Sequence, residues 1–132
     1  MEVVVDTSVL IAVLTSEAER AVLVELTRGV HLIAPASVHW EVGNAFAAML
    51  KRRRITLPEI EQALGAYEKI PLRLLAVDLT TSLRLAAEHN MYAYDAYVIA
   101  CASRQRCQLL TLDGGLARAA RAAGVQLAEI RK

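Results

Sequence analysis

The chain contains few aromatic residues, only two cysteines and almost no net charge. Aromatic residues make up 5% of its 132 residues, so the core has to be built mainly from alanine, leucine, valine and isoleucine. Fifteen basic and fourteen acidic residues give a formal net charge of +1. Any affinity for nucleic acid therefore has to come from local basic patches, because the chain has no strong overall positive field.

The sequence also lacks the segments that direct proteins to membranes or to secretion. No apolar stretch approaches the roughly 20 residues that a membrane-spanning helix needs. A basic leader is absent and Asp6 interrupts the first apolar run, so no signal peptide is expected. Cys101 and Cys107 form no C-x-x-C pattern and are interpreted as reduced packing residues. The expected location is the cytoplasm, with no membrane partner.

The chain does have a regular alternation of strand-like and helix-like segments. Short runs of β-branched and apolar residues predict strands at 3–5, 31–34, 72–77 and 108–112, with a weak fifth at 125–128. The spacing of apolar residues predicts helices at 9–14, 16–28, 37–54, 59–69, 80–89, 95–104 and 116–123. This alternation predicts an α/β fold and one domain over residues 1–132. Its central, mostly parallel sheet has about five strands, with helices on both faces.

Four acidic residues fall where this topology favours their convergence. Asp6 ends the first predicted strand and Asp113 follows the fourth, so both belong to the carboxyl edge of the sheet. Open α/β sheets bind ligands at that edge. Glu41 lies in the early turns of the helix after the second strand, and such helices start at the same edge. Asp95 begins a helix that follows a loop rather than a strand.

Each of these four acids also has an ordinary structural explanation. Asp6 is a suitable cap for the first helix, and Glu41 is a suitable half-exposed helix residue. Asp95 at a helix start is favoured by the helix dipole, and Asp113 before Gly114 is typical of a turn. Taken singly, the acids leave both interpretations open. As a cluster they would repel one another, which favours a hard divalent cation with oxygen ligands, such as Mg²⁺ or Mn²⁺.

Four short motifs in a fixed order carry a resemblance to a known family. They are Val4-Val-Asp-Thr-Ser-Val-Leu-Ile11, Pro35 followed by Glu41-Val-Gly-Asn44, Tyr94-Asp-Ala-Tyr-Val-Ile-Ala100, and Leu110-Thr-Leu-Asp113. The chain resembles the PIN-domain proteins over essentially its whole length, and most resembles the VapC toxins of prokaryotic toxin–antitoxin pairs. The resemblance implies a PIN-like fold. It also implies an Mg²⁺- or Mn²⁺-dependent endoribonuclease that hydrolyses RNA phosphodiester bonds by metal-activated water.

The resemblance further implies roles for particular residues. The four motif acids carry over as catalytic residues and metal ligands: Asp6, Glu41, Asp95 and Asp113. Three polar residues beside them carry over as supporting residues: Ser8, Asn44 and Thr111. Gly115 stands where some relatives have a further acid. This departure bears on a second metal site and not on the first.

Partners follow from the resemblance and from the basic residues. Arg118 and Arg121, on the helix after Asp113, are candidate RNA contacts. The basic run 51–54 is interpreted as a solvated helix end, with an RNA-phosphate contact as the alternative. Trp40 is interpreted as a packing residue, in the core or at an oligomer contact. The resemblance implies a VapB-like antitoxin and a homodimer. The alternative function is a catalytically weak PIN-fold module that docks RNA or an antitoxin.

Overall fold

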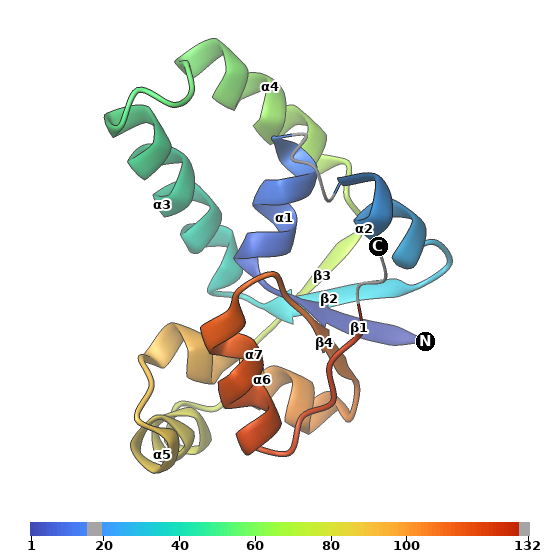
Figure 1. Cartoon of the computed structure of the whole chain (residues 1–132), viewed down its shortest axis with the longest axis vertical. Helices are drawn as coiled ribbons and strands as arrows, with labels where there is room; N and C mark the ends of the chain where they lie inside the picture. The colour runs from blue at the N-terminus through green and yellow to red at the C-terminus, as the bar shows by residue number, and fades with distance from the viewer. Residues whose placement is uncertain (16–19, 130–132) are drawn as a thin grey trace.

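Parallel strands joined by helices form the centre of the molecule (Figure 1). The computed structural model describes residues 1–15 and 20–129. Its strands are β1 (Glu2–Val5), β2 (His31–Pro35), β3 (Leu72–Leu75) and β4 (Gln108–Leu110). Its helices are α1 (Thr7–Leu14), α2 (Arg20–Leu26), α3 (Val38–Lys51), α4 (Leu57–Glu68), α5 (Leu79–His89), α6 (Ala93–Gln105) and α7 (Gly114–Ala122). The strands pair in parallel in the order β3-β2-β1-β4, which confirms the predicted α/β class.

The valine run of β1 is buried on both faces of the sheet. Val3 and Val5 pack with residues of α1 to α4, whereas Val4 packs with residues of α6 and α7 on the opposite face. The register places Val4 beside Ile33 of β2 and Leu109 of β4, and all three are fully buried. A continuous β-branched run is what a central parallel strand requires, because helices cover both of its faces.

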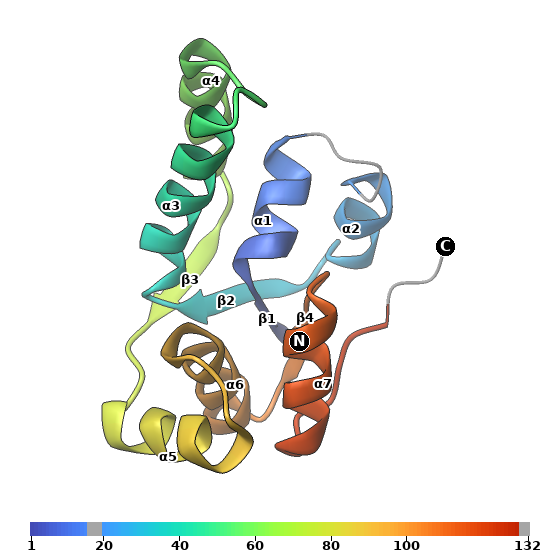
Figure 2. The ribbon, with the colours of Figure 1, turned by 60° about the vertical axis from the view of Figure 1, so that its left-hand side comes forward.

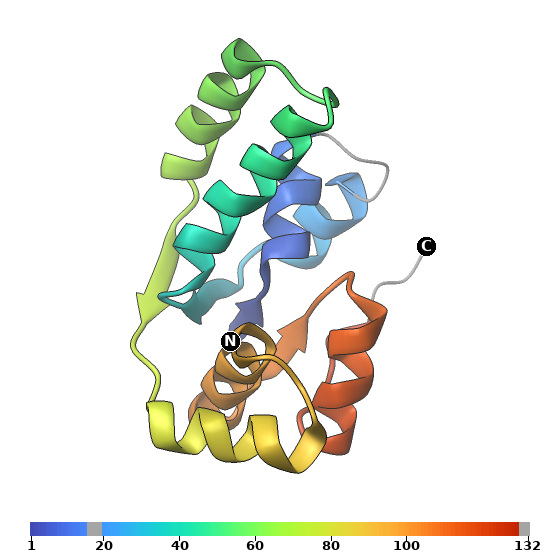
Figure 3. The same ribbon diagram turned by 90° about the vertical axis from the view of Figure 1, so that its left-hand side faces the viewer.

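Helices form one layer on each side of the sheet. Figure 2 shows α1 to α4 on one side and α5 to α7 on the other. Helix α5 packs against α6. Helices α3 and α4 form a hairpin that runs away from the sheet (Figure 3). Phe46 of α3 and Ile60 of α4 carry the apolar core into this hairpin. None of the helices in the described ranges is long and apolar enough to cross a membrane.

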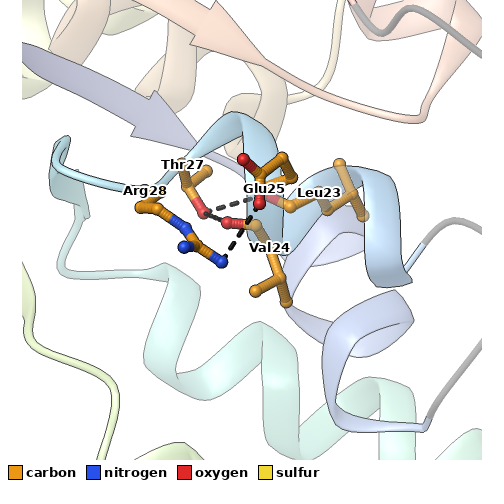
Figure 4. Close-up of polar contacts among 5 residues, drawn as sticks. All are labelled: Leu23, Val24, Glu25, Thr27 and Arg28. Carbon is orange, nitrogen blue, oxygen red and sulfur yellow. Dashed lines mark hydrogen bonds and ion pairs between the residues drawn. The ribbon is translucent and has the colours of Figure 1, made fainter.

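Local side-chain contacts define two of the helix ends. At the start of α4, Thr56 Oγ1 accepts a hydrogen bond from Glu59 N at 3.3 Å, and Glu59 Oε1 accepts one from Thr56 N at 3.0 Å. This reciprocal pair is a capping box. At the end of α2, the Thr27 hydroxyl donates to the carbonyl of Leu23 at 2.8 Å (Figure 4). The exposed Arg28 there forms an ion pair with Glu25, and such a solvent-exposed pair adds little stability.

Some predicted strand ends were wrong. β3 ends at Leu75 and β4 at Leu110, each two residues before the predicted end. The weak fifth strand at 125–128 is reduced to one bridge between Leu109 and Leu127. Gly124 precedes this segment with φ +85, a left-handed turn after which the chain meets β4 only briefly. The described sheet therefore has four strands.

Several helix ends also differ from prediction. α3 ends at Lys51 rather than Arg54, because Arg53 adopts φ 57, a left-handed conformation that breaks the helix. α6 begins at Ala93, two residues earlier than predicted, which moves Asp95 into its first turn. The helix predicted at 16–28 corresponds to α2, and its first four predicted residues lie outside the described ranges.

Candidate active site

Each of the four predicted acids lies at or near the start of a different helix. Asp6 is the N-cap of α1 and Asp113 is the N-cap of α7. Glu41 and Asp95 lie in the first turns of α3 and α6. Helix N-termini carry partial positive charge, which favours carboxylates there. The strand order reverses at β1, so the carboxyl ends of β1 and β4 border the crevice in which open α/β sheets bind ligands.

Asp6 is the most deeply buried of the four acids, with 6% of its surface exposed. Its Oδ1 accepts hydrogen bonds from Ser8 Oγ at 2.6 Å and Val9 N at 3.3 Å, and its Oδ2 accepts one from Thr111 Oγ1 at 2.6 Å. Burial raises the pKa of Asp6 and the charge of Asp113 adds to the rise, while the hydrogen bonds oppose it. A carboxylate has about four acceptor sites. The described residues therefore leave one of them, on Oδ2, for a further ligand.

Ser8 and Thr111 connect Asp6 to the loop between β4 and α7. The hydroxyl of Ser8 accepts a hydrogen bond from Leu112 N at 2.9 Å. The hydroxyl of Thr111 accepts one from Asp113 N at 3.0 Å while donating to Asp6. Two residues predicted as supporting residues therefore hold two predicted acids at fixed positions relative to each other.

This arrangement predicts a stability effect at Thr111. Thr111→Val keeps the branched shape of the side chain and removes the hydroxyl that bonds Asp6 and Asp113. We expect the free energy of unfolding in urea to fall by about 1 kcal/mol, the typical net value of such a hydrogen bond. Thr111→Ser keeps the hydroxyl and is the matched control. Equal stability of the valine and serine variants would contradict this role.

Glu41 carries the clearest sign of an unfilled interaction. Its Oε2 atom is buried and has no hydrogen-bond partner among the described residues. Burial raises the pKa of Glu41 to about 7, and the charges of Asp6 and Asp95 contribute to the rise. Buried polar atoms in folded proteins nearly always have a partner, so an orphan of this kind indicates a place for a ligand, an ion or water.

Asp95 completes an electrostatically coupled set. Burial is the main cause of the raised pKa of Asp95, and the charges of Asp113 and Asp6 raise this pKa further. The structure therefore brings Asp6 and Asp95 within range of each other's charge and of the charges of Glu41 and Asp113, although the sequence placed Asp95 least directly. As the side chains lie, no three histidine, cysteine, aspartate or glutamate residues in the described ranges form a group that could hold a metal ion. Mutual repulsion favours such a spread arrangement.

Two further hydroxyls lie at the same edge of the sheet. Thr7 directly follows Asp6, whose carboxylate caps α1. Ser37 precedes α3 and makes no side-chain cap. The hydroxyl oxygens of both residues are buried without a hydrogen-bond partner among the described residues. The signal in the sequence was their position: Thr7 follows Asp6 directly, and Ser37 stands one helical turn before Glu41.

Two further predictions concern α3. Asn44 is exposed and lies one turn after Glu41, on a neighbouring part of the helix surface. Its supporting role stays a prediction. Trp40 is 75% exposed, so the interpretation as a core residue is wrong. Its ring contacts His39 edge to face. An oligomer contact at Trp40 also stays a prediction.

The two arginines of α7 have different surroundings. The guanidinium of Arg118 lies over the first turn of α7, the helix that Asp113 caps. Arg121 lines a cavity of about 1080 Å³ together with Gln108 and residues of α2, none of which is a predicted site residue. Of the two arginines, Arg118 thus lies at the helix end that carries a predicted acid. RNA contact by Arg121 stays a prediction without a supporting neighbour.

The donor set has a definite chemical preference. Carboxylates and hydroxyls supply only oxygen, which is the ligand type of hard divalent cations such as Mg²⁺ and Mn²⁺. The orphaned Oε2 of Glu41 and the remaining acceptor site of Asp6 are both available for such an ion. The residues present therefore fit a divalent metal, and a metal would offset the burial and the repulsion that raise the pKa values of Asp6, Glu41 and Asp95.

Comparison with known proteins identifies relatives of this fold. A family profile described as PIN domain matches residues 3–122. PAE2754 from Pyrobaculum aerophilum has a similar structure, with a TM-score of 0.71, 22% identity, and coverage of 90% of this chain and 79% of that chain. VapC20 from Mycobacterium tuberculosis, described as a Sarcin-Ricin loop cleaving toxin, has a TM-score of 0.65 and 19% identity, with coverage of 98% of this chain and 99% of that chain. A toxin–antitoxin complex from Klebsiella pneumoniae has a TM-score of 0.54 and 16% identity, with coverage of 84% of this chain and 86% of that chain. No curated protein shows a significant match.

Proposed function

The chain belongs to the PIN-domain family, and on this premise we propose that it is an Mg²⁺- or Mn²⁺-dependent endoribonuclease. The observation that carries the proposal is the buried Oε2 of Glu41, which has no partner among the described residues and lies near the charges of Asp6 and Asp95. A purely structural set of caps would have no reason to leave this atom unsatisfied. Asp6, Glu41, Asp95 and Asp113 are the proposed metal ligands.

Each residue of the site has a distinct part in this proposal. Asp6 offers Oδ2, while Ser8 and Thr111 hold its carboxylate in one orientation. Glu41, with a pKa of about 7, gives up the proton that it carries part of the time at neutral pH. Asp113 adds charge at the mouth of the site. A bound divalent ion supplies the chemistry of polarising the phosphodiester and activating water.

The biological setting is also proposed. The likeness to VapC20 and to a toxin–antitoxin complex supports the role of a cytoplasmic toxin with a VapB-like antitoxin as its partner. Homodimer formation is supported by large apolar side chains that remain on the surface, including Leu79 and Leu83 of α5 and Tyr92 before α6. Exposed apolar groups of this kind often mark contacts with other proteins.

Two aspartates with the same capping role provide a sharp test of the proposal. Asp113 accepts a hydrogen bond from Leu116 N, and Asp78 accepts one from Thr81 N at the start of α5. Asparagine caps helices about as well as aspartate, so Asp113→Asn and Asp78→Asn both keep their helices. We expect Asp113→Asn to cleave RNA at least about tenfold more slowly, as for the loss of a group that supports a metal. Asp78→Asn should match the wild type.

The measurement is single-turnover cleavage of a randomised RNA library in Mn²⁺, with new ends identified by sequencing. EDTA should abolish cleavage by the wild type. If neither metal nor Asp113→Asn changes the rate, the endoribonuclease proposal is wrong. Retained RNA binding without cleavage in any divalent metal would instead support the alternative, a catalytically weak module that docks RNA or an antitoxin.

A further inference from the structure

The guanidinium of Arg118 folds back over the first turn of α7. A Cβ added to Gly114 would lie 3.4 Å from Arg118 Nη1, and one added to Gly115 would lie 3.9 Å from Arg118 Nη2. Side chains in helices lean toward the N-terminus, so residue 118 reaches the turn that precedes it. Both distances are ordinary van der Waals contacts, so the guanidinium lies directly over the two glycines.

The same space adjoins the acidic site. The Cβ position of Gly115 that lies near Arg118 is also 3.3 Å from Asp113 Oδ1. That oxygen is already engaged, because it accepts hydrogen bonds from Gly115 N at 2.9 Å and Leu116 N at 3.2 Å. The guanidinium of Arg118 and the carboxylate of Asp113 therefore both lie close to the Cβ position of Gly115. The carboxylate oxygen on that side, Oδ1, is the one that caps α7.

Arg118 has no counter-ion in the described part of the chain. The ion pairs found there involve Arg28, Arg73 and His89. The first turn of α7 contains no acidic residue either. An unpaired guanidinium at the start of a helix is unfavourable, since the helix dipole repels it. Its placement at the helix end that Asp113 caps is explained if it meets an anion that the acids of the site would otherwise repel.

We propose that Arg118 binds a phosphate of the RNA backbone directly beside Asp113, an inference that rests on the proposed function. Four carboxylates repel a phosphodiester at short range, so a substrate needs a positive group at the mouth of the site. The planar guanidinium fork binds phosphate oxygens in pairs, which fixes orientation as well as position. Because Arg118 projects from a helix, the bound phosphate is held in register with the acids.

The test is equilibrium binding of a fluorescein-labelled single-stranded RNA in EDTA, where cleavage does not interfere. Fluorescence anisotropy is measured over a series of KCl concentrations for the wild type, Arg118→Ala, Arg118→Lys and the control Arg104→Ala. Arg104 is an exposed arginine in the last turn of α6, and its removal changes the net charge equally. Alanine favours helix, so both alanine variants should keep their folds, which circular dichroism verifies.

We expect Arg118→Ala to bind RNA about fivefold to tenfold more weakly. The negative slope of the logarithm of the association constant against the logarithm of the salt concentration should become shallower by about 0.7, the value for the loss of one single-strand phosphate contact. Arg118→Lys should keep the slope and recover part of the affinity, and Arg104→Ala should match the wild type. Equal losses in both alanine variants, or none in either, overturn the inference. So does a wild type that binds no RNA. The proposed function is decided separately, by the cleavage rate of Asp113→Asn.

Discussion

We expect Asp6→Asn to cleave RNA at least about a hundredfold more slowly than the wild type in Mg²⁺ or Mn²⁺. A metal contributes several kcal/mol to stabilising the charge of such a transition state, and each factor of ten in rate corresponds to about 1.4 kcal/mol. Asparagine has nearly the same shape as aspartate and still accepts a hydrogen bond from Val9 N, so α1 keeps its cap. The substitution removes the charge of the most buried acid and replaces the oxygen that accepts from Thr111 with an amide donor.

The same variant should lose the stabilisation that metal gives to the fold. A ligand that binds only the folded state at a hundred times its Kd adds about 2.7 kcal/mol. For a chain of this size, that corresponds to a rise in Tm on the order of 10 °C. We expect the wild type to show this rise on addition of Mn²⁺ after EDTA treatment, and Asp6→Asn to show a much smaller one. Without metal the variant should be about as stable as the wild type, because the loss of one buried, repelling charge offsets the loss of the hydrogen bond from Thr111.

Asp78→Asn again provides the control, because Asp78 caps α5 as Asp6 caps α1. Its response to Mn²⁺ should equal that of the wild type. Equal Mn²⁺ responses in Asp6→Asn and the wild type would mean that Asp6 is a cap alone. The proposal of a metal site centred on Asp6 would then fail, whatever the cleavage assay gave.

The centre of the fold was predictable from local patterns, and its margins were not. The valine run of β1 and its end at Asp6 determine a buried parallel strand and the turn into α1. The end of α3 depends instead on the reversal into α4, which places Arg53 in a left-handed conformation. The run 51–54 consists of good helix formers, so the sequence itself does not predict that the helix ends there. The segment 125–128 has strand-like alternation, but only its contact with β4 decides how much of it pairs.

The site was predictable in its acids and not in its detail. Asp6 and Asp113 each had two interpretations, cap or ligand, and the structure shows that capping is real in both cases. The two interpretations do not compete, because a carboxylate that caps a helix can also be close enough to other acids to interact with their charges, as Asp6 is with Asp113. The hydrogen bond of Thr111 to Asp6 joins residues 105 positions apart. The fold of Arg118 over two glycines is likewise a matter of packing, which residue spacing alone does not reveal.

A second large effect is expected in the pH dependence of stability. The pKa of Glu41 rises from its usual 4.5 to about 7 in the folded protein. Between these values the unfolded chain has Glu41 ionised, while the folded chain keeps it protonated. The folded state therefore binds more protons, so the free energy of unfolding falls as pH rises through this window. The stability that protonated Glu41 contributes is complete below pH 4.5 and is lost as pH passes about 7.

Glu41→Gln removes this titration and keeps the shape of the side chain. Each unit of pKa shift corresponds to about 1.4 kcal/mol if solvent does not screen the charge. Glu41 is only half-buried, so solvent screens its charge considerably and the expected energy is smaller. We therefore expect the wild type to lose about 2 kcal/mol relative to Glu41→Gln between pH 5 and pH 8 in EDTA, measured by urea unfolding. Glu61→Gln, an exposed substitution on α4, should follow the wild type. Parallel pH curves for Glu41→Gln and the wild type would contradict the raised pKa of Glu41, which comes first from burial and then from the charges of Asp6 and Asp95.

The combination of outcomes at Glu41 separates structure from function. If the glutamate served the fold, its replacement would lower stability at every pH. We expect the reverse at pH 8: Glu41→Gln is more stable than the wild type without metal, yet it no longer cleaves RNA and gains less stability from Mn²⁺. A residue whose charge destabilises the fold, and whose buried oxygen has no partner in the part of the chain that the structure describes, is explained by the ion that this oxygen would bind.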